Sequence, residues 1–191
     1  ARSVFYIQYW STLVKILRFT CIKCSKLLID KEKYSYLLNY KNDERWQKVF
    51  SIASKKKRCG EDSTCGCGCL QPKLKKEGLA TLIAEWNEKE DDPKSSGKED
   101  SKLTMKLNPE LVIKILSKIS DEDVNFMGFN STFSRPEWMV CQVLAIPPPA
   151  IRPSVKHDAQ QRSEDDISHI IVNIIKANKT LQEKIDANAP E

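Results

Sequence analysis

The residues best suited to chemistry are cysteines, most of which fall into two short segments. The first is a Cys-x-x-Cys pair, Cys21 and Cys24, which places two thiolates on one side of a tight turn. The second segment contains, in chain order, Cys59, Cys65, Cys67 and Cys69. Two thiolates from each segment would form a tetrahedral zinc site with no position open to water or substrate, so we expect a structural metal. Spacing alone leaves open which members of the second segment are ligands.

The cysteines are expected to be reduced, which favours metal binding over disulfides. The apolar stretch that begins the sequence is interrupted by polar residues, and it lacks the basic start and small-residue cleavage site of a signal peptide. No stretch is long and apolar enough to span a bilayer, which predicts a soluble protein. The sequence begins without methionine and inside an apolar pattern, so we expect it to be a piece of a longer chain.

The composition is that of a folded protein with a small excess of positive charge. Of its 191 residues, 40% are hydrophobic and 30% are charged, which allows one domain or two small ones. The formal net charge of +5 is compatible with a polyanionic partner but does not by itself indicate one. Lysine and arginine are concentrated beside the second cysteine segment, at 55–58 and 73–76. They form either a solvated face or a contact with DNA phosphates.

Helices are expected around the two cysteine segments. Apolar residues recur at spacings of three and four over 3–19, which predicts an amphipathic helix that ends before Cys21. Two more helices are predicted over 30–39 and 43–53, with Asp43 as the N-cap of the second. We expect these helices to space the ligands and to cover the metal site.

Strands and then helices follow the second cysteine segment. Residues 74–77 and 81–86 are predicted to form a hairpin, and residues 102–107 a further strand. The intervening residues 87–100 are charged or polar without an apolar side chain, which predicts a mobile loop. Two short helices are predicted next, one capped by Asn108 and the other by Ser120.

A proline-rich segment comes after these helices. Residues 138–146 are apolar, include β-branched residues and have prolines on both sides, which predicts a buried strand. Consecutive prolines at 147–149 then fix φ and remove backbone donors, so we expect an extended, polyproline-like arm. The arm carries three fixed positive charges and one titratable ring, at Arg152, Lys156, His157 and Arg162. An inert proline-rich linker is the alternative interpretation.

The sequence ends in a predicted long helix. Ser163 and the acids after it are typical of a capping box. One face repeats at alternating spacings of four and three, as in a heptad seam, through Ile167, Ile171, Ile174, Asn178, Leu181 and Ile185. Packing on the chain's own core is the alternative. The far end of the helix is polar outside the seam, however, which favours a partner helix.

Several motifs, in their order and spacing, resemble one protein family. They are Pro-Glu-Trp-Met at 136–139, the apolar run, Ile-Pro-Pro-Pro-Ala-Ile-Arg-Pro-Ser at 146–154 and Arg-Ser-Glu-Asp-Asp at 162–166. Together they resemble the clamp region of the largest subunit of multi-subunit RNA polymerases, most nearly the RNA polymerase II type. The resemblance covers nearly the whole chain and implies an internal section of a much longer subunit.

The resemblance also implies which cysteines bind zinc. In this family the ligands are a Cys-x-x-Cys pair, a cysteine after a basic run and a cysteine four residues before Gln-Pro. The corresponding residues here are Cys21, Cys24, Cys59 and Cys67. Cys65 and Cys69 depart from the family pattern, so the fourth ligand stays open among Cys65, Cys67 and Cys69.

Two further parts of the chain receive roles from the resemblance. The proline-rich arm corresponds to the lid, a loop that helps to part the transcript from the template strand. This implies nucleic-acid contacts for Arg152, Lys156 and Arg162, with His157 in the place where the family often has an aromatic wedge. The last helix corresponds to the first half of the clamp coiled coil, whose tip binds initiation and elongation factors.

These inferences predict an α+β fold. It is a mainly helical, zinc-stapled module with short antiparallel strands, ending in a long helix that is half of a coiled coil. The expected parts are a zinc-binding clamp-head part at 1–86, a flexible acidic linker at 87–100, a helix and strand part at 101–145, the lid at 146–162 and the first coiled-coil helix at 163–191.

The resemblance implies a non-catalytic segment of DNA-directed RNA polymerase, a nucleotidyltransferase. The aspartate cluster that binds Mg²⁺ in this family is absent from the sequence, so only the rest of the parent enzyme would bind that ion. The expected partners are other polymerase subunits, DNA, the RNA–DNA hybrid and transcription factors, with no membrane. The expected location is the nucleus, or the cytoplasm for a viral polymerase. A free-standing zinc-binding interaction module is the alternative.

Overall fold

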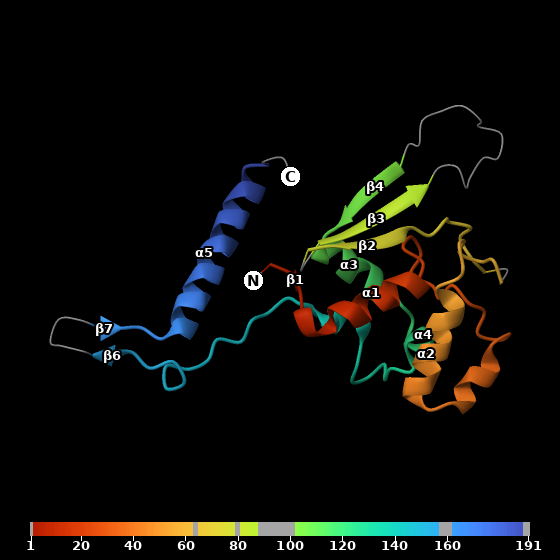
Figure 1. Cartoon of the computed structure of the whole chain (residues 1–191), viewed down its shortest axis with the longest axis horizontal. Coiled ribbons are helices and arrows are strands. Elements are labelled where there is room, and N and C mark those ends of the chain that lie inside the picture. Colours follow the sequence, from red (N-terminus) through yellow and green to blue (C-terminus); the bar gives the residue numbers. More distant parts are fainter. Residues whose placement is uncertain (1, 63–64, 79–80, 88–101, 157–161, 189–191) are drawn as a thin grey trace. The chain divides into compact units, whose positions relative to one another are not determined.

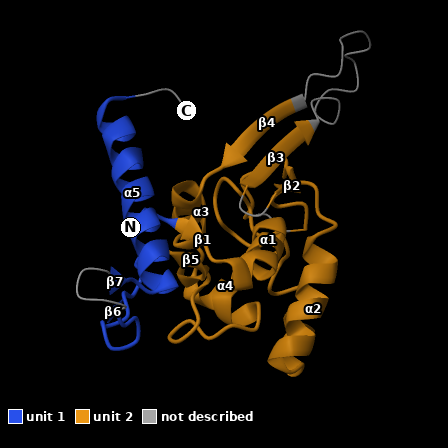
Figure 2. Cartoon of the chain, turned by 60° about the vertical axis from the view of Figure 1, so that its left-hand side comes forward, with its two compact units in different colours: residues 1–3, 142–191 blue, residues 4–141 orange. Residues whose placement is uncertain are grey.

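The computed structural model describes residues 2–62, 65–78, 81–87, 102–156 and 162–188 (Figure 1). The chain divides into a larger unit, residues 4–141, and a smaller unit, residues 1–3 with 142–191 (Figure 2). Helices and short antiparallel strands occur together, which confirms the predicted α+β class. His157 and nearly all of the acidic segment 87–100 lie outside the described residues.

Helix α1 (Trp10–Phe19) lies at the centre of the larger unit's core. The helix predicted over 3–19 thus forms only from Trp10 onward. The first residues of the predicted range form strand β1 (Val4–Phe5), which pairs antiparallel with β5 (Val140–Cys141), and then the 3-10 helix η1 (Ile7–Tyr9). The buried side chains of α1 are Trp10, Leu13, Val14, Ile16, Leu17 and Phe19.

Aromatic rings join α1 to helix α2 (Asn42–Ala53). The Phe19 ring is fully buried and meets the Trp46 ring edge to face, with the ring centroids 5.0 Å apart. The predicted cap at Asp43 is wrong, because the N-cap position is Lys41, whose side chain makes no capping hydrogen bond. Asp43 instead lies in the first turn, where its charge complements the helix dipole.

The helix predicted over 30–39 is mostly absent, and only the 3-10 helix η2 (Ser35–Asn39) forms there. Its N-terminal part is a turn, in which the Asp30 carboxylate accepts a hydrogen bond from the backbone N–H of Glu32 at 3.0 Å. Aspartate that bonds nearby backbone in this way competes with helix formation. The apolar spacing alone did not reveal that competition.

A three-stranded antiparallel sheet, ordered β2-β3-β4, covers part of this core. Its strands are β2 (Lys73–Glu77), β3 (Thr81–Asn87) and β4 (Lys102–Leu107), which confirms the predicted hairpin and third strand. Leu74 pairs with Ala84, and Leu82 pairs with Leu107. All four of these side chains are buried, so one face of the sheet belongs to the core.

The two short helices after the sheet begin as predicted. In helix α3 (Pro109–Leu116), the Asn108 side chain accepts a hydrogen bond from Leu111 N at 2.8 Å. In helix α4 (Asp121–Phe126), the Ser120 hydroxyl accepts one from Asp123 N at 3.2 Å. Both caps satisfy a backbone donor that the first helical turn leaves without a partner.

The buried strand predicted over 138–146 forms only at Val140–Cys141, and the rest of the prediction is wrong. Residues Pro136–Met139 form the 3-10 helix η4, and strand β5 that follows has only two residues. Its partner β1 is equally short, and because Val4 lies opposite Cys141 in the antiparallel register, residues after Cys141 would have to pair with residues before Val4, the first residue of β1. Beyond β5, Val143 is 82% exposed and Ile146 is 55% exposed.

The smaller unit contains a turn, a hairpin and a long helix. The expected extended arm contains a turn that begins within its prolines, in which Ile151 N donates to Pro148 O at 3.0 Å. Strand β6 (Val155–Lys156) then pairs antiparallel with β7 (Arg162–Ser163).

Helix α5 (Asp166–Asp186) has its N-cap two residues later than the cap predicted at Ser163. Its N-cap is Asp165, whose side chain accepts from Ile167 N at 3.0 Å. Among the described residues, no helix has the length and apolar character needed to cross a membrane.

Candidate metal centre

Four cysteine sulfurs from the two segments come together in the larger unit. Those of Cys21, Cys24, Cys59 and Cys67 all lie within 4.8 Å of one another. The sulfur of Cys21 is 3.5 Å from that of Cys67, and the sulfur of Cys24 is 3.6 Å from that of Cys59. A tetrahedral zinc ion with Zn–S bonds of about 2.3 Å places its sulfurs about 3.8 Å apart. The donor set and its spacing therefore fit such an ion.

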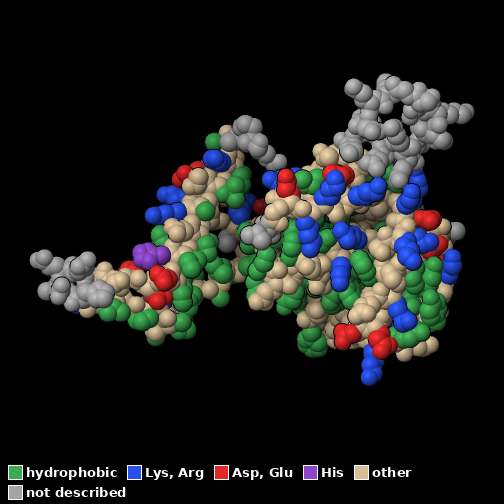
Figure 3. All heavy atoms as spheres, in the orientation of Figure 1, with side chains coloured by type: hydrophobic (Ala, Val, Ile, Leu, Met, Phe, Trp, Pro, Cys, Tyr) green, Lys and Arg blue, Asp and Glu red, His purple; other side chains and the backbone are tan. Residues whose placement is uncertain are grey.

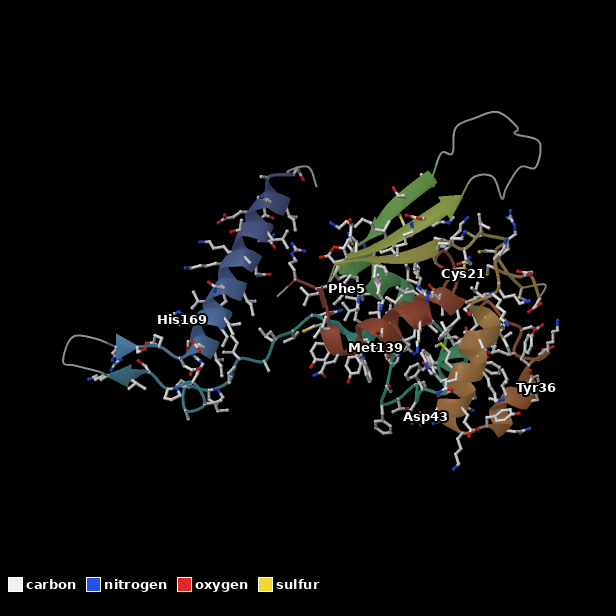
Figure 4. The ribbon with its side chains drawn as sticks, in the orientation of Figure 1. Phe5, Cys21, Tyr36, Asp43, Met139 and His169 are labelled. Atoms are coloured by element: carbon white, nitrogen blue, oxygen red, sulfur yellow. The ribbon has the colours of Figure 1, made fainter. Side chains whose placement is uncertain are left out.

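The first pair of sulfurs is held by a tight turn directly after α1 (Figure 4). Cys21 N donates to Lys26 O at 2.8 Å, and Ser25 N donates to Cys21 O at 2.8 Å. Closing this turn puts Ser25 in the left-handed region, with φ of 61°. The Ser25 hydroxyl oxygen is buried and has no hydrogen-bond partner among the described residues. Sequence reasoning missed this residue, although the return of the chain after a Cys-x-x-Cys pair is a signal for such a conformation.

Replacing Ser25 with glycine is expected to stabilise the protein. Glycine adopts positive φ without the penalty of an L side chain, and the change removes a buried hydroxyl that lacks a partner. After subtracting glycine's greater freedom in the unfolded chain, we expect a gain of up to about 1 kcal/mol in the free energy of unfolding. Chemical denaturation of the metal-loaded protein measures it.

The matched control is Ser51→Gly on the exposed face of α2. That residue is helical, so its replacement should lower the free energy of unfolding by about 0.5 kcal/mol. A loss of stability in Ser25→Gly equal to that of the control would contradict the assignment of strain to Ser25.

The second pair of sulfurs is held by a loop that closes on itself. Cys59 N donates to Cys69 O at 3.0 Å, and Gly68 N donates to Cys59 O at 3.0 Å. These bonds curl the chain so that Cys67 faces the other three sulfurs. The cysteine group that the structure brings together in the described residues includes Cys67 and neither Cys65 nor Cys69. The sulfur of Cys69 lies 3.5 Å from Leu70 O instead.

Burial and hydrogen bonding act on the thiols in opposite directions. Burial raises the pKa of Cys24 and the pKa of Cys59, so both favour the thiol form without a cation. Burial also acts to raise the pKa of Cys67, but hydrogen bonds from the Cys69 backbone and from the other three thiols outweigh it and lower that pKa to about 7. A metal ion must therefore displace protons from the buried thiols when it binds.

An ion-pair cluster holds the loop beside the candidate metal centre. The Asp62 carboxylate lies 2.7 Å from Lys56 Nζ and 3.6 Å from Lys33 Nζ, and it accepts a hydrogen bond from the Tyr34 hydroxyl at 3.3 Å. The hydrogen bond from Lys56 lowers the pKa of Asp62, and in turn Asp62 raises the pKa of Lys56. The Lys56 ammonium group is therefore paired with a carboxylate of the protein and is less available to a phosphate group.

Several of the basic residues around the cysteines make contacts within the larger unit itself. Lys75 pairs with Glu85 at 2.8 Å, and Lys76 Nζ lies 5.8 Å from the centre of the Trp10 ring. Lys and Arg side chains lie at several separate places on the visible face of the larger unit (Figure 3). The hypothesis of a DNA contact here thus depends on fewer available charges than the sequence suggested.

The residues predicted to contact nucleic acid differ in their surroundings. Arg152 Nε donates to Pro147 O at 2.9 Å and its Nη1 donates to the Ser168 hydroxyl at 3.3 Å, so its guanidinium faces the smaller unit itself. Lys156 and Arg162 are exposed and lie directly opposite each other across β6 and β7. The structure brings these two together, while His157 lies outside the described residues.

The fold and the four sulfurs define a class of protein: an α+β module with a candidate structural metal centre and no open coordination position. The family described as RNA polymerase Rpb1, domain 1, has a model that matches residues 1–191. The chain belongs to that family.

Two relatives illustrate the relationship. The chain is 38% identical over 194 residues to the DNA-directed RNA polymerase II subunit RPB1 of Euplotoides octocarinatus, with 97% of the chain and 39% of that protein covered. It is 33% identical over 199 residues to the DNA-directed RNA polymerase subunit Rpo1N of Methanocaldococcus jannaschii, with 100% of the chain and 13% of that protein covered. The chain thus spans well under half of the length of either relative.

Proposed function

We propose that the chain is a non-catalytic clamp segment of the largest subunit of a DNA-directed RNA polymerase, a nucleotidyltransferase. The family match over the whole chain supports this, as do two relatives that are named as RNA polymerase subunits. The segment would help to hold DNA and the RNA–DNA hybrid during transcription, together with other polymerase subunits. The similarity to an RNA polymerase II subunit favours work in the nucleus.

The observation that carries the proposal is the meeting of the four sulfurs. They come from two loops that are far apart in the sequence, so an ion between them would fix the larger unit. We propose Zn²⁺, with Cys21, Cys24, Cys59 and Cys67 as its ligands. Four thiolates close the coordination sphere, and the ion would supply rigidity instead of reaction chemistry. Mg²⁺ for nucleotide addition would be bound by the rest of the parent enzyme.

The lid is the part proposed to contact nucleic acid directly. Lys156 and Arg162 are like charges directly opposite each other across two strands, an arrangement that destabilises a free hairpin. A phosphate group bound between them would relieve the repulsion. Arg152 has a different proposed role, since its bonds to Pro147 O and Ser168 hold the base of the lid against the start of α5. We propose no separate role for His157, which belongs to the same loop.

Helix α5 is proposed as the first half of a coiled coil that docks transcription factors at its tip. Its seam is accessible, since Ile174 is 39% exposed and both Leu181 and Ile185 are 44% exposed. Asn178, the polar member of the seam, accepts a hydrogen bond from Arg2 N at 2.9 Å. Burial of these apolar side chains against a second helix would be favourable, because it removes their surface from water.

The variant Lys156→Ala/Arg162→Ala tests the lid. In the reassembled polymerase we expect a longer retained RNA–DNA hybrid, because the hairpin would no longer hold the phosphates where the strands part. Nucleotide addition should continue, since the lid contributes no catalytic group. Loss of two phosphate contacts should also reduce the slope of log K against log salt by about 1.5. Nuclease mapping of the hybrid and binding at several salt concentrations measure the two effects.

The matched control replaces two exposed lysines of the larger unit, Lys114 and Lys118, with alanine. It removes the same charge and should leave the hybrid length unchanged. If the lid variant and the control give the same hybrid length as the unaltered enzyme, the lid role is excluded.

A further inference from the structure

We infer that Gln71 is a positioning residue of the metal centre, which joins the two cysteine loops and donates a hydrogen bond to the sulfur of Cys21. The inference rests on the proposed structural metal. Gln71 Nε2 lies 3.3 Å from Cys21 Sγ and 2.8 Å from Cys69 O, while its Oε1 lies 3.1 Å from Ile22 N. One carboxamide therefore contacts both the turn after α1 and the second cysteine loop.

The backbone partners determine which way the carboxamide points. Ile22 N–H can only donate, so it requires the oxygen of the amide, and Cys69 C=O can only accept, so it requires the nitrogen. Reversing the amide would lose both bonds. With the orientation fixed in this way, the N–H group that remains on the amide is directed to the sulfur of Cys21.

The main chain of Gln71 is fixed as well. Its N–H donates to Lys57 O at 2.7 Å, and the preceding Leu70 forms a bridge with Arg58. Leu70 O also accepts a hydrogen bond from the Trp86 indole at 3.1 Å, which ties this point to strand β3. The carboxamide is thus held by the loop and by the sheet, and it does not depend on the metal for its position.

The sulfur of Cys21 needs such a donor for an electrostatic reason. Four thiolates around one divalent cation carry a net charge of about −2, which hydrogen bonds from the protein must partly compensate. Cys21 is 0% exposed, so water does not reach its sulfur. The N–H of Gln71 supplies part of the compensation, and it also prevents the Cys21 side chain from turning away from the ion.

Two substitutions remove the N–H donor to sulfur and keep different parts of the tether between the loops. Gln71→Met keeps the approximate size of the side chain and removes all of the side-chain hydrogen bonds. Gln71→Glu, ionised at neutral pH, keeps an oxygen for Ile22 N–H but has no N–H for Cys21 Sγ or for Cys69 O. The matched control is Gln47→Met, at an exposed position of α2.

The measurements use the full 191-residue chain loaded with zinc or cobalt. We expect both Gln71 variants to transfer zinc to a chelator at least about ten-fold faster than the unaltered chain. In the cobalt forms, the sulfur-to-metal charge-transfer band should move to longer wavelength, because a thiolate without its donor gives up an electron more easily. The control should match the unaltered chain in both measurements.

The possible outcomes are distinct. If Gln71→Glu releases zinc at the rate of the unaltered chain and its cobalt band is not displaced, donation to sulfur is unimportant and the inference is wrong. The band position is read from folded, metal-loaded protein, so a loss of stability alone does not imitate the effect. If the unaltered chain itself binds neither metal, the proposed metal centre fails, and the inference fails with it.

Discussion

Replacing Cys21 with serine is expected to remove most of the stability of the larger unit. Metal binding contributes an apparent free energy of about 10–16 kcal/mol in small zinc-dependent domains, which is comparable to the whole stability of a typical domain. Cys21 is 0% exposed and follows α1 directly, so loss of its ligand bond would loosen the turn on which the central helix ends. Thermal unfolding with metal analysis measures the effect, and chelation of the unaltered chain should reproduce it.

The control for this substitution is Cys141→Ser, in strand β5 and outside the four-sulfur group. It changes the same atom type and should leave the metal content at the level of the unaltered chain. A Cys21→Ser protein that keeps both its thermal transition and its metal would contradict the proposed site. So would an unaltered chain that is metal-free, fully folded and reactive at all seven thiols.

The elements that sequence reasoning predicted correctly are those fixed by neighbouring residues. Asn108 before Pro109 and Ser120 before a run of acids provide local hydrogen bonds for a helix start, and both helices begin there. Strands β2, β3 and β4 likewise follow from alternation within short segments. None of these depends on where a distant part of the chain lies.

The incorrect predictions involve partners that the local pattern does not contain. Residues 138–146 are apolar enough for a strand, but their pairing is limited to the two residues of β1, which lie at the start of the larger unit in the sequence. At 30–39, the side-chain bond from Asp30 stops a helix that the apolar spacing favours. The cap was predicted at Ser163, but Ser163 pairs with Val155 in a hairpin, so the helix is capped by Asp165 instead.

The candidate metal centre could be predicted only in part from the sequence. The spacing of the first pair selects Cys21 and Cys24 as candidate ligands, whereas the choice among Cys65, Cys67 and Cys69 depends on how the second loop curls. The bonds between Cys59 and Cys69 and between Gly68 and Cys59 bring Cys67 beside the other three sulfurs, and no spacing rule contains these bonds. Gln71 was visible in the sequence only as part of a Gln-Pro motif, because its partners lie in both loops.

Replacing Gly66 with alanine is expected to open the second cysteine loop and abolish stable metal binding. A Cβ at this position would lie 2.1 Å from the Cα of Gly60, 2.3 Å from its nitrogen and 2.6 Å from the carbonyl carbon of Cys59. All three are main-chain atoms, so no side-chain rotation relieves the overlap. The backbone must shift, and a shift at Cys59 moves the buried sulfur of this proposed ligand away from the other three sulfurs. Zinc content and the thermal transition measure the result.

Gly68→Ala is the control that separates close approach from backbone conformation. Gly68 has φ of +71°, but a Cβ there would have no heavy atom within 4 Å. The expected cost is therefore only the strain of an L residue in the left-handed region, about 1–2 kcal/mol, with the metal retained. If the two variants lose metal equally, the contact between the backbones at Gly60 and Gly66 is not what closes the loop. A larger loss in Gly66→Ala would show that the site depends on the packing of main chain against main chain, a constraint that explains why glycine stands there without a positive φ.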